Sequence, residues 1–344
     1  MKRFKQITIP IMAAIGLYVL ILDTKTAVSG AQEGIQICIK TLIPSLFPFF
    51  MVSGLFCSVY SGINLTFLNP ILRLCHMPNG SGSLLVVGLL GGYPVGAKAI
   101  ADSQKEGNLD LQDARRMMCF CNNAGPSFIF GILSNLFENA LAPWILLFIS
   151  ILSAIITGWL LPVNNQSNST SIKTNRMNVA QIFNSSIRAI VSVCGWIILF
   201  RVILSFLKRW FLWAMPSTIQ VIIAGVIELA NGCLELGMID QDGVRFVMAA
   251  VMLSFGGLCV YLQTAAVAGQ TGTGLYFPGK VLQSLIALVL AGIGQLFLFS
   301  GQNRMPFIGF LPPTILLLII VIVVKTRKIQ RNKNNCSILH LCDV

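Results

Sequence analysis

Charged side chains are scarce in this sequence, and acidic ones are the scarcest. Asp, Glu, Lys and Arg make up 10% of the 344 residues, only 12 of them acidic, whereas 55% of the residues are hydrophobic. Soluble domains carry roughly 25% charged residues, so a soluble protein of this length is excluded. Uncharged runs such as 145–161 and 314–324 suit a bilayer core about 30 Å thick, which a helix crosses in roughly 20 residues. The composition predicts an integral membrane protein.

Histidine is almost missing, and the cysteines form no metal-binding or redox pattern. His76 and His340 are far apart in sequence, and Cys119 and Cys121 are spaced C-x-C with no second cysteine pair or histidine nearby. Zinc sites need such a second pair, and thiols inside apolar runs behave as small hydrophobes. We therefore expect no metal and no cofactor. Since no nucleophile–base set is present either, we expect that the protein is not an enzyme.

The net charge of +12 is concentrated at the two ends of the chain. Basic residues precede the first apolar run at positions 2, 3 and 5, and follow the last one between 325 and 333. Basic residues beside membrane spans mark cytoplasmic ends, so both termini are expected in the cytoplasm of a multi-pass cell-membrane protein. No basic stripe with interleaved aromatics predicts nucleic-acid binding; the expected partner is the lipid bilayer. The alternative for the run 7–22 is a signal peptide, cleaved at Ala27-Val28-Ser29. The run is long for a signal peptide, so an uncleaved anchor helix fits it better.

Apolar runs and their interruptions follow one order twice. Each half has a span, a short helical hairpin, a broken span and a plain span. In the first half these are 35–60, 83–105 with its turn at Gly91–Gly96, 113–135 with its interruption at Asn122–Pro126, and 141–161. In the second half they are 187–206, 219–236 with its turn at Asn231-Gly232, 244–268 with its interruption at Ser254–Gly257, and 281–299. The predicted boundaries are 1–34 for an anchor helix and loop, 35–161 for the first repeat, 162–186 for a polar cytoplasmic linker, 187–300 for the second repeat and 301–344 for a last span and basic cytoplasmic tail.

Each repeat contains three full crossings, an odd number, so the second repeat must enter the membrane inverted. The predicted fold is an all-α polytopic membrane protein with about eight full spans and two re-entrant hairpins, the architecture of many secondary transporters. In this topology Lys280 falls on the cytoplasmic side. Non-helical backbone at membrane depth persists only inside protein or beside a water-filled cavity. We therefore expect the two hairpin tips to meet at a central cavity.

Polar residues at the four interruptions are the candidates for binding an ion or a small polar solute, because broken helices expose free N–H and C=O groups. They are Gly92, Tyr93, Pro94, Gly96 and Lys98; Asn122, Asn123, Gly125 and Ser127; Glu228 and Asn231; and Ser254, Gly256, Gln263 and Thr264. The alternative is a structural role: small residues permit close helix packing, and Lys98 can extend to the interface. Glu228 is the most informative, because a carboxylate at membrane depth is costly and usually functional. We expect it to pair with Lys98 or Arg201, or to be protonated, whereas Glu235 fits an interfacial position.

Residues 88–133 carry a family resemblance. A Gly-Tyr-Pro-x-Gly-Ala-Lys turn at Gly92–Lys98 and an Asn-Ala-Gly-Pro-Ser-Phe-Ile break at Asn123–Ile129 resemble the nucleoside-recognition, or Gate, domain. More closely, they resemble the YlbJ-like sporulation integral membrane proteins of spore-forming bacteria. The order of elements is also similar to concentrative nucleoside transporters, but their polar hairpin motif, Gly-Gln-Thr-Glu-Ala-Pro, aligns with Gly91–Gly96, which has no acidic or amide side chain.

The resemblance implies a bacterial membrane protein involved in spore formation, and two functions remain open. One is a transporter-like protein that moves a small polar solute or an ion. The other is a scaffold or assembly factor for the spore envelope or cortex, which keeps the fold without transport. A homo-oligomer or a complex with other sporulation membrane proteins is compatible with either.

Overall fold

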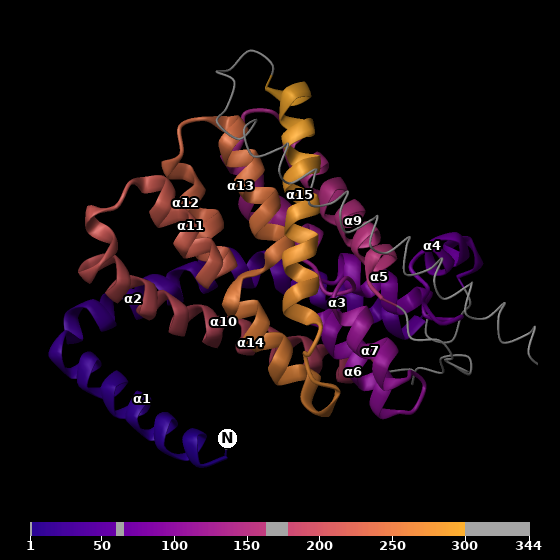
Figure 1. The fold of residues 1–344 in the computed structure, drawn as a ribbon, viewed down its shortest axis with the longest axis horizontal. Coiled ribbons are helices and arrows are strands. Elements are labelled where there is room, and N and C mark those ends of the chain that lie inside the picture. The colour runs from indigo at the N-terminus through magenta and orange to yellow at the C-terminus, as the bar shows by residue number, and fades with distance from the viewer. Residues whose placement is uncertain (1, 60–64, 163–177, 300–344) are drawn as a thin grey trace, which may run out of the picture.

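Helices form nearly all of the regular structure in the computed structural model of the chain (Figure 1). The structure describes residues 2–59, 65–162 and 178–299, and no strand occurs among them. Five helical stretches there are long and apolar enough to cross a membrane: Thr24–Phe56, Ala142–Leu160, Val179–Trp210, Asp242–Thr271 and Tyr276–Leu298. An all-α membrane protein with several spans is thereby confirmed. The total of eight spans stays a prediction, and the expected span at 307–324 lies outside the described residues.

The N-terminal region is more helical than the sequence predicted. Helix α1 (Lys2–Leu22) is followed at once by α2 (Thr24–Ile37), a π-helical turn η1 (Cys38–Leu42) and α3 (Ile43–Val59). The loop expected before residue 35 is therefore largely helix, and Asp23 caps α2 by accepting a hydrogen bond from Thr26 N at 3.3 Å. Gly30 and Gly34 let α2 lie against the backbone of a later helix, α10 (Val179–Trp210).

Each half contains a helical hairpin. The first consists of α5 (Gly82–Leu90) and α6 (Val95–Lys105), with the turn where the sequence predicted it; the second consists of α11 (Ser217–Ile227) and α12 (Leu229–Glu235). The second turn lies at Glu228 and not at Asn231-Gly232, which are inside α12. The side chain of Glu228 caps α12, and Gly232 serves as the contact between the two helices, since a Cβ there would lie 2.6 Å from Gly225 N.

Both broken spans are interrupted at the predicted positions, but they differ in length. The second is α13 (Asp242–Phe255) and α14 (Gly257–Ala268), separated by Gly256 in a left-handed conformation with φ +82°. The first is the short α7 (Leu111–Met118), a non-helical stretch and then α8 (Pro126–Phe128), a π-helical turn η3 (Ile129–Leu133) and a 3₁₀ turn η4 (Ser134–Leu136). The first broken span therefore contains no helix long enough to cross a membrane alone.

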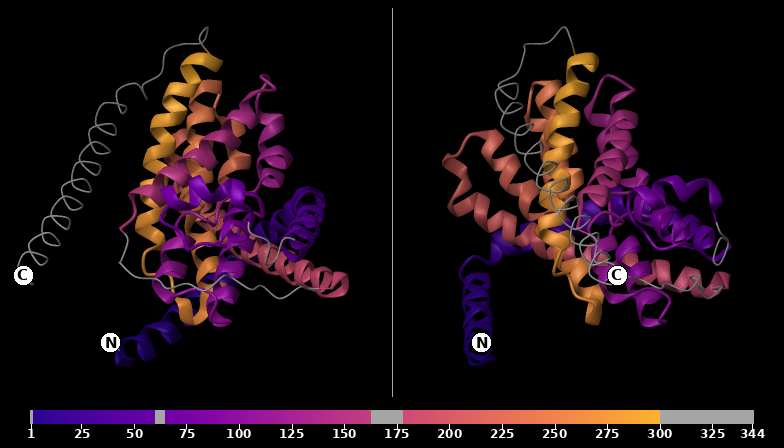
Figure 2. Two further views of the ribbon diagram at one scale, coloured as in Figure 1. Left: turned by 90° about the vertical axis from the view of Figure 1, so that its right-hand side faces the viewer. Right: turned by 45° about the vertical axis from the view of Figure 1, so that its right-hand side comes forward.

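The remaining helices enclose these interruptions. Helices α9 (Ala142–Leu160), α13 and α15 (Tyr276–Leu298) pack side by side, while α10 packs along α2 and α3 (Figures 1 and 2). Helix α14 packs against α6 and α11. The short α4 (Asn69–Leu74) and the 3₁₀ turns η2 (Thr66–Leu68), η5 (Leu212–Ala214), η6 (Leu236–Met238) and η7 (Gly269–Thr271) complete the described structure. Since α10 begins at Val179, the last residues of the expected linker are helical.

Candidate functional site

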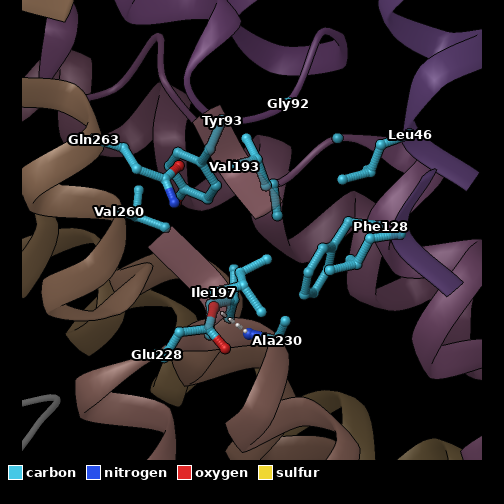
Figure 3. A pocket seen from close by; sticks show the side chains of 14 residues that line it. Leu46, Gly92, Tyr93, Phe128, Val193, Ile197, Glu228, Ala230, Val260 and Gln263 are labelled. Atoms are coloured by element: carbon cyan, nitrogen blue, oxygen red, sulfur yellow. Dashed lines mark hydrogen bonds between the residues drawn. The ribbon is translucent and has the colours of Figure 1, made fainter. Parts of the chain in front are cut away.

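A small cavity lies between the two hairpin turns, the first break and α14, the helix that follows the second break (Figure 3). Its lining residues come from η1, α3, α8, α10, α12, α14 and the interruptions: Leu42, Leu46, Gly92, Tyr93, Ala124, Gly125, Phe128, Val193, Ile197, Glu228, Leu229, Ala230, Val260 and Gln263. The cavity has a volume of about 40 Å³, room for a few water molecules at ~10–15 Å³ each. Most of its wall is apolar, so Glu228, Gln263 and Tyr93 provide its polar character.

The first hairpin turn is held directly against the first break. Gly92 has φ +78°, and a Cβ on Gly125 would lie 3.0 Å from Gly92 Cα, so the two backbones touch. The hydroxyl of Tyr93 donates to Leu253 O in α13 at 3.1 Å. This turn is thereby fixed to both the first break and the second broken span.

Three other candidates of the first hairpin lie outside the cavity lining. Pro94 precedes α6, and Gly96 packs tightly against Cys121 and Gly88. Lys98 donates to Ser185 Oγ in α10 at 2.9 Å, so the structure does not pair it with Glu228. The role of these residues is to shape and hold the hairpin.

Asn122 connects the first break to three helices. Its Nδ2 donates to Thr264 Oγ1 in α14 at 2.9 Å and to the hydroxyl of Tyr276 in α15 at 3.2 Å, while its Oδ1 accepts from Ala97 N in α6 at 3.3 Å. Asn122 and Thr264 are fully buried. A direct side-chain contact therefore joins the first break to the second broken span.

Asn123 is bound to a buried lysine that the sequence did not single out. Asn123 Oδ1 accepts from Lys280 Nζ at 3.0 Å and from Gln283 Nε2 at 2.8 Å, and Lys280 Nζ also donates to Gln283 Oε1 at 2.8 Å. Lys280 is only 1% exposed and lies within α15, so it is a buried helix residue, and its position on the cytoplasmic side stays a prediction. Its spacing from Gln283, three residues along an otherwise apolar helix, places two polar side chains on one helix face, a signal that was available in the sequence.

The ammonium group of Lys280 is surrounded by neutral groups. It lies 5.3 Å from the ring centre of Tyr93 and 5.8 Å from that of Tyr276, a geometry that favours a cation. Within residues 2–59, 65–162 and 178–299 no carboxylate forms an ion pair with it. Buried charges are normally paired, so Lys280 is an unusual feature one side chain behind the cavity wall.

Glu228 also lacks the cation that the sequence led us to expect. It is 2% exposed, and its two carboxylate oxygens accept from Ala230 N at 2.9 Å and from Asn231 N at 2.6 Å. Arg201 in α10 instead binds Glu33 at 2.6 Å and Glu235 at 3.1 Å. Glu228 is thus a carboxylate satisfied by backbone donors and directed at the cavity, as Figure 3 shows.

Glu235 and Asn231 belong to the ion-pair cluster beside Glu228. Glu235, expected at the interface, is 6% exposed and accepts from Lys208 Nζ at 2.5 Å as well as from Arg201. Asn231 Oδ1 accepts from Arg201 at 3.1 Å. The cluster ties α12 to α10 and, through Glu33, to α2.

The remaining candidates line or support the second break. Gln263 lines the cavity and donates to Cys259 Sγ at 3.1 Å. A Cβ on Gly256 would lie 3.2 Å from the Tyr93 hydroxyl, so this break faces the first hairpin turn. Ser254 and Ser127 are buried beside the two breaks. Five candidates therefore line the cavity itself: Gly92, Tyr93, Gly125, Glu228 and Gln263.

Comparison with known proteins finds a sequence similarity to a sporulation membrane protein. Neither a protein-family model nor a solved structure matches the chain significantly, so the assignment of a Gate domain stays a prediction. The sporulation integral membrane protein YlbJ of Bacillus subtilis (strain 168) is 23% identical over 310 residues, a match that covers 76% of this chain and 75% of YlbJ. Together with the long apolar helices, this similarity confirms the resemblance that residues 88–133 predicted: the chain is an integral membrane protein related to YlbJ.

Proposed function

We propose that the protein serves spore formation as a transporter-like membrane protein, which binds a small polar solute or an ion at the cavity between its two hairpins. The observation that carries this proposal is that both hairpin turns and the first break line one small cavity, and that α14, which begins at the second break, forms a further part of its wall. Interrupted helices at membrane depth are the usual binding elements of secondary transporters. YlbJ, by its name a sporulation protein, supports the biological context.

The proposal includes an inverted repeat formed by residues 35–161 and 187–300. Both hairpins are built around one close glycine crossing: a Cβ on Gly96 would lie 2.8 Å from Gly88 Cα, and a Cβ on Gly232 would lie 2.6 Å from Gly225 N. These pairs occupy the same place in each half, with one glycine before the turn and one after it. An inversion with three crossings per repeat keeps both termini and the linker in the cytoplasm.

A second correspondence joins each hairpin to the break of its own half. A Cβ on Gly88 would lie 2.5 Å from the carbonyl carbon of Cys121, at the start of the first break. In the second half, a Cβ on Gly257 would lie 3.0 Å from Gly225 O. The first helix of each hairpin therefore touches the following break through a glycine, which supports a common origin of the two halves.

Recognition is assigned to Glu228, which lines the cavity, and to Asn122 and Asn123, which were expected to line it but lie behind its wall, next to Ala124. Asn side chains offer both donor and acceptor atoms, and Glu228 offers the carboxylate that faces the cavity. Lys280 joins this group through its hydrogen bond to Asn123. A solute recognised here would have to replace an internal hydrogen bond with one of its own. A buried donor or acceptor left without a partner is costly, so only a solute with matching polar groups would bind.

A scaffold or assembly factor is the second candidate function, and one observation favours it. The cavity is small, and Asn122 and Asn123 are already engaged in internal hydrogen bonds. Such a network would also serve to fix the fold without any solute. The two functions differ in whether the protein moves a solute, so transport measurements separate them.

Complementation of a sporulation defect tests the site. If Asn123 and Glu228 recognise a solute, Asn123→Ala and Glu228→Gln lose complementation at normal membrane abundance. The exposed Asn135→Ala and Glu106→Gln make the same chemical changes away from the site and should complement fully. Loss of abundance and function together would indicate a packing role, and full complementation by both site variants would refute the assignment.

Uptake into liposomes by the purified protein separates the transporter from the scaffold. The screen covers nucleosides, amino acids and inorganic ions, with Asn123→Ala as the matched control. Accumulation of one class by the unchanged protein, lost in the variant, supports the transporter. A protein that complements sporulation but moves no solute supports the scaffold.

A further inference from the structure

Glu228 occupies an unusual position for a carboxylate. It is the single non-helical residue between α11 and α12, it is 2% exposed, and it lies on the cavity wall between Ile197 and Ala230 (Figure 3). A carboxylate at membrane depth is costly and is usually functional. The cavity that it lines has room for water.

The charges around Glu228 do not balance. The neighbouring cluster contains Arg201 and Lys208 as cations and Glu33 and Glu235 as anions, all joined by ion pairs. With Glu228 ionised, three carboxylates face two cations, and no cation among the described residues forms an ion pair with Glu228 itself. Glu33 is half exposed to solvent, whereas Glu228 is a buried carboxylate without a cation of its own.

Other groups near Glu228 do not supply such a cation. The titratable side chains that interact with it electrostatically are Arg201, already shared between two carboxylates, and the thiols of Cys38, Cys233 and Cys259. Helices α11 and α14 contain no charged residue. On α13, Asp242 and Arg245 pair with each other at the start of the helix, at 2.9 Å.

An unsatisfied donor lies in the same place. Asn231 is fully buried and its Oδ1 is held by Arg201, while its Nδ2 makes no hydrogen bond of normal geometry among the described residues, although its side chain interacts with Glu228. A buried amide nitrogen without a full partner is rare in native structures.

We infer that Glu228 reversibly binds a proton from the cavity, and that this proton controls the start of α12. Uptake forms an O–H bond on one carboxylate oxygen, and release returns the proton to cavity water. Protonation neutralises this buried carboxylate. This inference deepens the proposed function, because a bound proton would couple solute movement to the proton gradient across the membrane.

The control of α12 follows from the hydrogen bonds of Glu228. Ionised, it accepts from two backbone N–H groups with separate oxygens. Protonated, one of these oxygens becomes a hydroxyl donor and a weaker acceptor, so the cap on α12 weakens. Leu229 and Ala230, the first residues of α12, line the cavity. Proton binding and cavity shape are therefore linked through this helix.

Infrared titration of the full-length protein in liposomes tests proton binding without any solute. The unchanged protein should show a protonated-carboxyl band, at the frequency of groups shielded from water, that appears and disappears with pH. Glu228→Gln should lose this band completely, whereas Glu106→Gln, an exposed acid-to-amide change, should keep it. Coincident difference spectra of the unchanged protein and Glu228→Gln would overturn the inference.

Glu228→Asp covers the case in which the amide variant does not fold. Its shortened carboxyl group should retain a band at a shifted frequency, and a spectrum identical to that of the unchanged protein would again overturn the inference. A second measurement is the hydrogen-exchange rate of the α12 amides relative to that of the α15 amides in the same sample. This relative rate should rise on acidification in the unchanged protein and stay constant in Glu228→Gln. An equal change in both proteins would refute the control of α12. Because no step depends on transport, a failed uptake screen leaves these results interpretable.

Discussion

Adding one methyl group at Gly232 should separate the two helices of the second hairpin. A Cβ at this position would lie 2.6 Å from Gly225 N, and the obstructing atoms are backbone that no side-chain rotation can move. Gly225 in turn packs on the Met252 side chain of α13, where its own Cβ would lie 2.7 Å from the sulfur. Since carbon atoms pack at about 3.5–4.0 Å, α11 and α12 must move apart by about 1 Å.

The expected cost of this movement is about 1–3 kcal/mol, the usual range for overpacking a buried site. Thermal unfolding of the purified protein in detergent measures it as a lower melting midpoint for Gly232→Ala. Sporulation complementation should fall as well, because Glu228 sits between the two helices that move.

Gly195→Ala is the matched control. Gly195 is an exposed glycine in the interior of α10, and a Cβ there would meet no heavy atom within 4 Å. Alanine is a better helix former than glycine by roughly 0.5–1 kcal/mol, so this variant should melt at the same temperature as the unchanged protein or higher. If Gly232→Ala melts together with Gly195→Ala, the close crossing of α11 and α12 is wrong.

Three further predictions follow from the same structure. Lys280→Met should keep or raise the melting midpoint, because it removes a buried ammonium group without leaving a carboxylate unpaired. The same variant should lose complementation. If the melting midpoint and complementation fall together, Lys280 serves stability alone. Arg116→Gln should lower membrane abundance, because the buried guanidinium donates to three backbone carbonyls and each carbonyl left unsatisfied costs about 1–3 kcal/mol. Arg73→Gln, the same change at an exposed position, should leave the abundance unchanged. Immunoblots of membrane fractions compare the two variants. Reporter fusions after residues 170 and 335 should both report the cytoplasm, and opposite sides would contradict the inverted repeat.

Local chemistry in the sequence was sufficient to locate most interruptions. Glycine and proline mark the first hairpin turn and both breaks, because both residues favour helix ends, and Gly92 and Gly256 do have positive φ. The same rule failed where glycine serves packing. Gly30 and Gly34 lie within a helix against α10, and Gly232 lies within α12, because a missing side chain also permits close approach of two backbones.

The sequence by itself determined that this is a helical membrane protein, since 55% hydrophobic residues and long uncharged runs leave no other fold class. It also determined which segments are interrupted and the relation to YlbJ, both of which depend on residues close together in the chain. Pairing was decided only by the tertiary structure. Asn123 binds Lys280, which is 157 positions away in the sequence. Arg201 forms ion pairs with Glu33 and Glu235, which are 168 and 34 positions away, and not with Glu228. Burial of an ionisable group depends on which helices surround it, and periodicity along one helix carries no information about its neighbours.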